Sequence, residues 1–336
     1  MDLTARSLEE CDIPAGLDLL RGHLAYPDDV LALLPRAWRR LLRDGALIAT
    51  LIEQRRADGA PSAVGFGASV FVTDAWAAHA RAGVEPYLSA RTIRQELGGR
   101  SPILRPRAIA RSHDAGGLNM LILHYGEAAA LPLDARPALR YRMLQALIEA
   151  HRGYRIKDIL QEFWDEIDEE FVVRGWGRVV TDYASFVRHH CETPPPGRRP
   201  HLIGITREEA LAHPGNPAAP IFLYTPPRLS FTRAEQKMIG PALLGRTDVE
   251  LARSLHIALA TVKSRWRSIY NRVGRIAPEL LPSVDPANVG SVSRGQEKRR
   301  RLLDYVRRHP EELRSAHCAP STRQGRPRRR RAVIRK

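Results

Sequence analysis

A proline-rich segment between Cys191 and Arg228 is the sequence feature that most constrains the fold of this chain. It contains the runs ETPPPGRRPH and AHPGNPAAPIFLYTPPR. Proline has no backbone N–H and disfavours a helical residue before it, so such a segment interrupts helices and central strands and favours extended backbone. We therefore expect a linker at 191–228 that divides the 336 residues into two domains, which suits a chain of this length.

Charge is concentrated on one side of this boundary. Residues 226–336 hold 26 Lys and Arg against 9 Asp and Glu, a net charge of +17, whereas residues 1–225 hold 27 against 28, a net charge of −1. A general adaptation for solubility would spread charge along the chain, whereas a block of one sign is typical of a polyanionic partner. The charge favours nucleic acid as the partner of the second domain, ahead of an anionic membrane.

Several classes of protein are excluded by what the sequence lacks. The three cysteines, Cys11, Cys191 and Cys318, are far apart and form no CxxC pair, so no disulfide framework is expected. His189, His190 and Cys191 have no second ligand cluster nearby, so no metal is expected either. No signal peptide and no apolar run of membrane-spanning length is present. We expect a cytoplasmic, nucleoid-associated protein that does not bind membranes.

Residues 258–273 have the pattern of an amphipathic helix with a basic outer face. Apolar residues recur at spacings of three and four, which places them on one stripe that must face a core. The residues between them are small, polar or cationic, and no carboxylate occurs from Ser254 to Pro278. The apolar stripe consists of Leu259, Val262, Trp266, Ile269 and Val273.

Two shorter helices are expected before this one, because two capping boxes occur upstream. Thr232 with Glu235, and Thr247 with Glu250, have the spacing at which both side chains satisfy the first backbone amides of a helix. Gly245 lies between the two helices, where a tight turn would reverse the chain. Three short helices around one small core indicate a helix-turn-helix unit, which places its second motif helix in the major groove of DNA.

The stretch from Leu229 to Gly274 resembles the LuxR-type helix-turn-helix domain. The resemblance implies that 258–273 is the recognition helix. Pro241, Ala258 and Arg265 depart from the usual pattern: they predict a kink in the first helix, a lost helix cap and an altered base specificity, respectively. The expected DNA contacts are Thr247, Thr261, Lys263, Ser264, Arg265, Arg267 and Ser268.

A basic helical extension is expected at 277–316, followed by a disordered Arg-rich tail at 317–336. The tail has too little apolar content to fold alone. Its Gln324–Arg328 segment resembles the Gly-Arg-Pro core of an AT-hook, which lies in the minor groove, and its arginines would also attract phosphates regardless of sequence. The tail adds Arg326, Arg328, Arg329, Arg330 and Arg331 to the expected DNA contacts.

Residues 1–190 show a mixed α/β pattern. Apolar or alternating runs predict strands at 46–54, 62–74, 119–126 and 155–163, and helical periodicity predicts helices at 15–24, 29–44 and 138–154. This order is similar to the GCN5-related N-acetyltransferase fold. That resemblance implies a glycine-containing loop that binds pyrophosphate after the strand at 119–126, yet no glycine occurs between Gly126 and Gly153. It also implies a tyrosine acid where Phe171 stands.

Together these patterns predict an α+β protein, with an α/β acetyltransferase-like domain at 1–190 and an all-α DNA-binding domain at 229–276. We expect a sequence-specific transcriptional regulator that binds double-stranded DNA as a homodimer. Its amino-terminal domain would sense a small-molecule or protein signal, with no catalytic residues and no cofactor, so the chain would not be an enzyme. Two alternatives remain open: an acetyltransferase fused to a DNA-binding domain, and a nucleoid-associated protein of low specificity.

Overall fold

The chain folds as two compact units, Met1–Pro226 and Pro227–Lys336. The computed structural model describes residues 2–20, 28–56, 59–164, 172–183, 200–282 and 291–314. Much of the expected linker at 191–228 belongs to the first unit instead. Its apolar residues Leu202, Ile203 and Phe222 are buried in that unit, so the proline-rich composition hides a folded segment. That segment consists of β7 (His201–Thr206), α9 (Arg207–Ala212) and α10 (Ala219–Phe222).

The amino-terminal unit is built on one sheet, in which the described residues provide seven strands in the order β1-β2-β3-β4-β5-β7-β6. All neighbouring strands run antiparallel except β4 and β5, which run parallel. The parallel pair requires a crossover connection, and a helix between the two strands provides it. The remaining strands are β1 (Leu3–Ser7), β2 (Ile48–Arg55), β3 (Pro61–Val72), β4 (Leu118–Glu127), β5 (Ile156–Phe163) and β6 (Arg178–Thr181).

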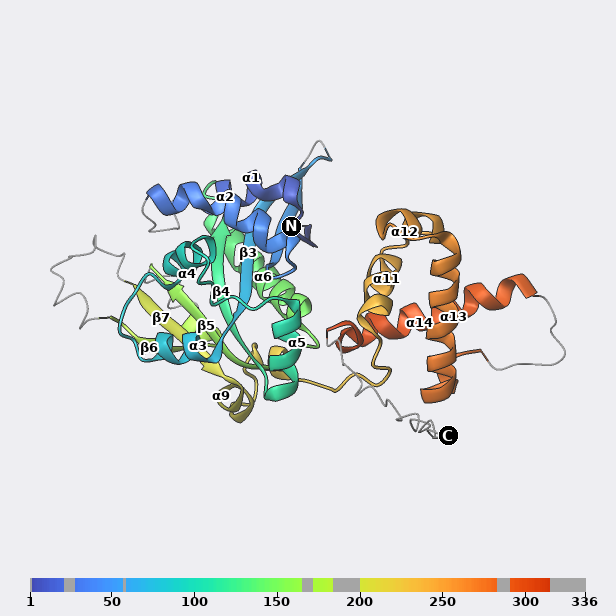
Figure 1. Cartoon of the computed structure of the whole chain (residues 1–336). Helices are drawn as coiled ribbons and strands as arrows, with labels where there is room; N and C mark the ends of the chain where they lie inside the picture. Colours follow the sequence, from blue (N-terminus) through green and yellow to red (C-terminus); the bar gives the residue numbers. More distant parts are fainter. Residues whose placement is uncertain are drawn as a thin grey trace, which may run out of the picture. The chain divides into compact units, whose positions relative to one another are not determined.

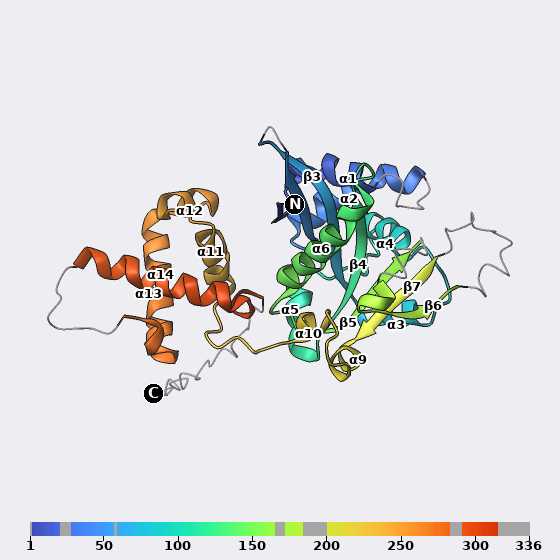
Figure 2. The same cartoon turned by 180° about the vertical axis from the view of Figure 1, so that it is seen from behind.

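Helices cover both faces of this sheet, as the two opposite views in Figure 1 and Figure 2 show. One face packs against α1 (Ile13–Leu20), α2 (Asp28–Arg43), α3 (Asp74–Arg81) and α4 (Leu88–Leu97). The other packs against α5 (Pro106–Ala115), α6 (Arg136–His151) and the short helices after β7. Because both faces are covered, the central strands are apolar on both sides, as the sequence of β4 shows.

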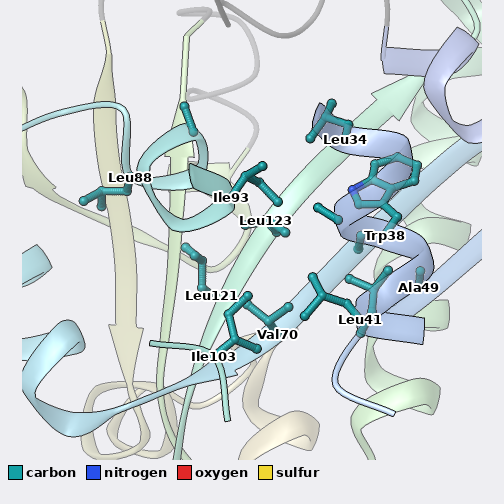
Figure 3. Close-up of a cluster of buried hydrophobic side chains, with 14 of the residues drawn as sticks. Leu34, Trp38, Leu41, Ala49, Val70, Leu88, Ile93, Ile103, Leu121 and Leu123 are labelled. Carbon is teal, nitrogen blue, oxygen red and sulfur yellow. The ribbon is translucent and has the colours of Figure 1, made fainter. Parts of the chain in front are cut away.

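The larger core lies between the sheet and α2 and α4. Figure 3 shows Trp38 of α2 and Ile93 of α4 lying over Leu121 and Leu123 of β4. Trp38 is fully buried and stacks on Phe66 of β3 with ring centroids 4.8 Å apart. Burial of this many aromatic and aliphatic side chains fixes how the helices sit on the sheet.

The carboxy-terminal unit contains four described α-helices. Both expected capping boxes are present: Thr232 and Glu235 begin α11, and Thr247 and Glu250 begin α12. Ala258 precedes α13 and gives it no side-chain cap. Pro241 does not end α11, which continues for two residues beyond it. The helices are α11 (Arg233–Leu243), α12 (Asp248–Ser254), α13 (Leu259–Ile276) and α14 (Ser291–Arg308).

The apolar stripe of α13 faces the core of this unit with one exception. Val262, Trp266, Ile269 and Val273 are buried, whereas Leu259 is 38% exposed and does not belong to the buried cluster. The expectation that Leu259 faces the core is wrong: it is the first residue of α13 and lies at the edge of the buried cluster.

A buried carboxylate joins the two ends of the helical unit. Glu312 is fully buried, and its Oε atoms accept hydrogen bonds from the backbone N–H groups of Arg228 and Leu229 at 2.9–3.0 Å. The hydroxyl of Tyr305 donates to the same carboxylate at 3.0 Å. The basic extension therefore packs on the trihelical body as an integral part of it.

Candidate active site

The central sheet opens where β4 and β5 separate. Their parallel pairing runs from Leu118 opposite Ile156 to Ile122 opposite Gln161, and the described pairing ends there. Beyond this point β4 stays paired with β3 as far as Glu127, while β5 stays paired with β7 as far as Phe163. The facing edges of the two strands thus part in the middle of the sheet.

A β-bulge in β4 accompanies this parting. His124 pairs with Ala68 of β3 and Ile122 pairs with Ser69, so Leu123 lies between them as the extra residue. A bulge bends its strand and increases the local twist. We attribute the departure of β4 from β5 to this bend, because the described pairing with β5 ends immediately before Leu123.

A cleft of about 80 Å³ lies at the parting, beneath α6. Ile122 and His124 from β4 line it on one side, and Gln161 and Phe163 from β5 line it on the other. Its mainly apolar lining with a few polar groups is typical of a small-molecule site. The cleft is closed by Gly67, Ala68, Tyr125, Arg140, Met143, Leu144, Leu147, Val172 and Trp176.

His124 provides a neutral polar group at the parting. Its ring lies 5.3 Å from the ring of Trp38 and only 2% of the residue is exposed. Burial lowers the pKa of His124 to about 3, because the charged imidazolium would lose its hydration there. His124 is therefore uncharged near neutral pH.

Glu162 places a carboxylate on the opposite side of β5 from the cleft. Its neighbours Gln161 and Phe163 line the cleft, and successive strand residues point to opposite faces. The Oε1 atom accepts the backbone N–H of Tyr87 at 2.7 Å, and the amides of Leu88 and Ser89 at the start of α4 also donate to this carboxylate. Burial nevertheless raises the pKa of Glu162 to about 7, since it outweighs these hydrogen bonds.

Tyr183 shares this buried region with Glu162. The side chain is 1% exposed, and burial followed by the charge of Glu162 raises the pKa of its hydroxyl. Neither the Tyr183 hydroxyl nor Glu162 Oε2 has a hydrogen-bond partner among the residues that the structure describes. Tyr183 also has a positive φ of 52°, an uncommon backbone conformation for tyrosine. A buried acid, a hydroxyl and strained backbone together are typical of a functional site.

A second carboxylate, Glu127, lies at the end of β4 beside the start of α6. It accepts Arg140 Nε at 2.6 Å, and Arg136 Nη1 lies 3.9 Å from it. The Tyr125 hydroxyl donates to Glu127 as well. Only 1% of the Glu127 side chain is exposed, so its negative charge is compensated by these neighbours rather than by water.

The loop between β4 and α6 uses some of its amides in backbone hydrogen bonds. Pro132 has no N–H, and the N–H of Ala128 donates to Val64 O on β3 at 2.9 Å. Three further N–H groups donate within the loop: Leu131 to Ala128 O, Ala135 to Pro132 O and Arg136 to Leu133 O.

Five of the twelve expected DNA contacts are exposed on α13. Thr261, Lys263, Ser264 and Arg267 lie on its surface, and Arg265 is half-buried. None of these cations has an ion pair among the described residues. The structure thus brings the expected contacts of this helix together on one outer face.

Two other expected contacts have structural roles. The Ser268 hydroxyl donates to Glu235 Oε1 at 3.2 Å, which links α13 to the start of α11. The Thr247 hydroxyl donates to Glu250 Oε2 at 2.9 Å as part of the capping box. The tail residues Arg326, Arg328, Arg329, Arg330 and Arg331 lie outside the described residues, as do Phe171 and the His189–Cys191 cluster.

The residues that the structure describes contain no group of His, Cys, Asp and Glu side chains that could hold a metal ion. None of the helices they form has both the length and the apolar character needed to cross a bilayer.

The sequence interpretation missed Glu162, His124 and Tyr183. A usable signal was present for the first two, because a histidine and a glutamate occur within otherwise apolar strands, NMLILHYG and RIKDILQEF. Polar residues in buried strands are rare enough to be informative.

Comparison with known proteins relates the amino-terminal unit to solved structures. No family model and no curated protein sequence matches the chain. The C-terminal condensation domain of Ebony in complex with beta-alanyl-dopamine matches with a TM-score of 0.40 and 12% identity, over 61% of this chain and 99% of that chain. A chimera of spermidine N-acetyltransferase SpeG from Vibrio cholerae and hSSAT matches with a TM-score of 0.36 and 13% identity, over 63% and 100%. Arabidopsis thaliana NAA60 in complex with acetyl-CoA matches with a TM-score of 0.37 and 11% identity, over 62% and 99%.

At such low identity these similarities describe the fold. The amino-terminal unit is similar to several N-acetyltransferases, with TM-scores below 0.5. The comparisons give no support for a LuxR-type domain, for DNA binding or for transcription regulation.

The expectation of a transcriptional regulator with a non-catalytic amino-terminal domain, and hence of a protein that is not an enzyme, is therefore wrong. The solved structures that are similar to this unit include several N-acetyltransferases. The missing glycine loop and the phenylalanine at 171 do not imply that the whole site is lost, because a cleft lies between β4 and β5.

Proposed function

We propose that the amino-terminal unit is an acyltransferase that moves an acyl group from a thioester to an amine. The parting of β4 and β5 is the observation that supports this most directly. It creates an unpaired strand edge inside the sheet, next to an apolar cleft, and an extended amide-bearing arm can hydrogen-bond to such an edge. A pantetheine arm has this chemistry, because it alternates amides with methylene groups.

The residues of the cleft fit such an arm. Met143, Leu144 and Leu147 on α6 offer apolar surface to methylene groups, while the β5-facing backbone of Leu123–Glu127 offers hydrogen-bonding groups. The loop before α6 does not fit the pyrophosphate of coenzyme A, for the reasons given above, and no step in our mechanism depends on it. The acyl thioester itself would lie where the strands separate, near His124.

Glu162 is our candidate for the group that accepts the proton. An amine attacks a thioester carbonyl only when its nitrogen lone pair is free, so the ammonium must lose a proton. A carboxylate with a pKa of about 7 is well suited to accept it near neutral pH. The amine nitrogen then bonds to the carbonyl carbon, the C–S bond breaks, and the departing thiolate takes up a proton to give the free thiol.

A cleft-filling variant tests this function. Purified protein would be incubated with an acetyl thioester and a panel of primary amines, and released thiol would be measured. Leu144→Trp places a large side chain in the cleft and should lower transfer by at least about tenfold, because the arm can no longer enter. Tyr141→Trp is the matched control, since Tyr141 lies on the same helix and is 63% exposed.

Two results would contradict the proposal. One is that the wild-type protein releases no more thiol with an amine than without one, whichever thioester is used. The other is equal activity of Leu144→Trp and Tyr141→Trp, which would mean that the cleft is not where the donor binds.

We further propose that the helical unit is a DNA-binding domain fused to this transferase. The exposed face of α13 supports it, with Lys263 and Arg267 outward and no carboxylate between Ser254 and Pro278. The LuxR-type resemblance suggests that this helix enters the major groove, and two such units in a homodimer would contact two half-sites. A small-molecule or protein signal remains part of this proposal.

Binding to double-stranded DNA at several salt concentrations tests this second function. Lys263→Ala with Arg267→Ala should lower the affinity for DNA at least about tenfold and flatten its salt dependence. With fewer phosphate contacts, fewer counterions are released from the DNA on binding. Arg300→Ala with Arg301→Ala is the control, since both arginines pair with Glu297. An equal loss in both double variants would refute a role for the α13 face.

A further inference from the structure

We propose that the acyl donor is a thioester of a pantetheine arm that lacks the adenosine diphosphate part of coenzyme A. This rests on the acyl-transfer function proposed above and narrows its donor. Two independent features support it: the amides of the loop between β4 and α6, and the carboxylate of Glu127 at the same place.

The first feature is the shortage of amides where a pyrophosphate would lie. A helix N-terminus binds phosphate through backbone N–H groups that point outward without an acceptor. At the start of α6, Pro137 has no N–H and the N–H of Arg136 already donates to Leu133 O. In the preceding loop Pro132 has no N–H, and Leu131 and Ala135 donate to carbonyls of the loop. The prolines and these hydrogen bonds reduce the number of amides that could bind a phosphate at this place.

No glycine lets a phosphate approach the backbone of this loop either. Gly126 is the last glycine before α6, and a Cβ built on it would lie 2.6 Å from Leu19 O. The absence of a side chain at this position lets β4 approach α1. Glycine at 126 is therefore explained by helix packing and not by phosphate binding. No other glycine occurs until Gly153, at the far end of α6.

The second feature is the negative charge of Glu127. Arg136 and Arg140 are the cations nearest the start of α6, and both lie against the Glu127 carboxylate. Arg140 is itself largely buried, with 12% of its side chain exposed, so its guanidinium is held in this pair. An incoming pyrophosphate would have to compete with a buried carboxylate for the same arginines, and like charges repel strongly where water is scarce.

The apolar part of the cleft does not include Glu127. It consists of Met143, Leu144 and Leu147 of α6, Ile122 of β4 and Phe163 of β5, while Arg140 and Tyr125, which contact Glu127, also line the cleft. The site thus recognises the arm and the thioester, and offers nothing built for the nucleotide.

Donor truncation tests the inference. Amine-dependent thiol release by the full chain would be measured with acetyl-coenzyme A and with acetylpantetheine, at equal concentrations and over a range of both. If an enzyme binds the pyrophosphate of its donor, it loses that binding energy when the donor lacks this group. For such an enzyme, kcat/KM with acetylpantetheine would be at least about 30-fold lower than with acetyl-coenzyme A. We expect the two kcat/KM values to differ by less than about threefold.

The possible outcomes separate this inference from the function it rests on. Transfer from acetyl-coenzyme A at least 30-fold better than from acetylpantetheine would overturn the inference and leave the acyltransferase function standing. No transfer from either donor would overturn both. A third measurement uses acetyl-phosphopantetheine attached to an acyl carrier protein as the donor. A kcat/KM more than about tenfold above that for acetylpantetheine would identify a carrier-bound pantetheine as the source. Equal kcat/KM values would identify a small thioester.

Glu127→Gln provides a test within one protein. Removing this charge releases Arg136 and Arg140, so the KM for acetyl-coenzyme A should fall severalfold while the KM for acetylpantetheine stays unchanged. Since both donors are measured on the same variant, a folding defect would alter both values and cannot imitate the result. Glu149→Gln, near the other end of α6, is the control and should alter neither. Equal changes for the two donors in Glu127→Gln would overturn the role of Glu127.

Discussion

The carboxylate of Glu162 accepts the backbone N–H of Tyr87 at 2.7 Å, although the two residues are 75 positions apart. Tyr87 precedes α4 with a φ of 67°, a left-handed conformation that aims its N–H and those of the next two residues at the carboxylate. One oxygen of Glu162 is thereby fixed by the helix terminus, while the other has no described partner. This arrangement orients a base without neutralising it.

Glu162→Gln should lower kcat/KM for acyl transfer by about 100-fold, because the amide cannot accept the proton of the amine. In the wild type, kcat/KM should rise with pH and level off above a pKa of about 7, where Glu162 becomes ionised. The variant should lack this rise. A pH profile measured with a thioester and the best amine checks both expectations, and an unchanged rise in Glu162→Gln would assign it to another group.

The same substitution should stabilise the amino-terminal unit at high pH. The folded-state pKa of Glu162 lies near 7, above its ordinary value of 4.5, so its contribution to stability is fully present below pH 4.5 and is lost as the pH rises through 7. Gln carries no charge at any pH, and should therefore raise the free energy of unfolding at pH 8 by on the order of 2–3 kcal/mol relative to wild type. Urea denaturation at pH 4.5 and pH 8 measures this difference. Glu149→Gln, whose side chain is 65% exposed, should show no such pH dependence.

Gly65→Ala should destabilise the amino-terminal unit by about 1–3 kcal/mol, because β3 lies very close to α6 at this point. A Cβ at Gly65 would lie 2.9 Å from Leu139 Cδ1 and 3.0 Å from Met143 Sδ. Gly67→Ala, on the same strand, is the control, since a Cβ there meets no atom within 4 Å. Thermal denaturation of the two variants compares them directly. If Gly67→Ala is the more destabilised of the two, the close approach is not what requires glycine at 65.

Glu312→Ala should destabilise the helical unit by about 3 kcal/mol or more. It would leave the buried N–H of Leu229 and the Tyr305 hydroxyl without their acceptor. Glu279→Ala breaks only an exposed pair with Arg228 and should cost less than about 1 kcal/mol. Denaturant unfolding monitored by circular dichroism measures both, and similar values would argue against the role assigned to Glu312.

Elements with a strong local signal could be predicted from the sequence. The strands around Leu121 and Leu160 are apolar on both faces, and the two capping boxes determine where α11 and α12 begin. The exposed cations of α13 followed from helical periodicity. These features depend on residues within one or two turns, or on one strand.

Other elements could not be predicted because their stability comes from distant contacts. Strand β7 lies in proline-rich sequence and is held by pairing with β5, for example at Ile203 opposite Gln161. The cleft depends on where the β4–β5 register ends, and the segments concerned are about 40 residues apart in the sequence. The pKa of Glu162 depends on burial under α4, which no local pattern reveals.

Glu312 also has a consequence for protein engineering. Because its carboxylate accepts the N–H groups of Arg228 and Leu229, residues near the first and last described positions of the helical unit lie next to each other. A domain whose ends meet can be spliced into a surface loop of a host protein without stretching either partner. The helical unit thus suits use as a transplantable insert.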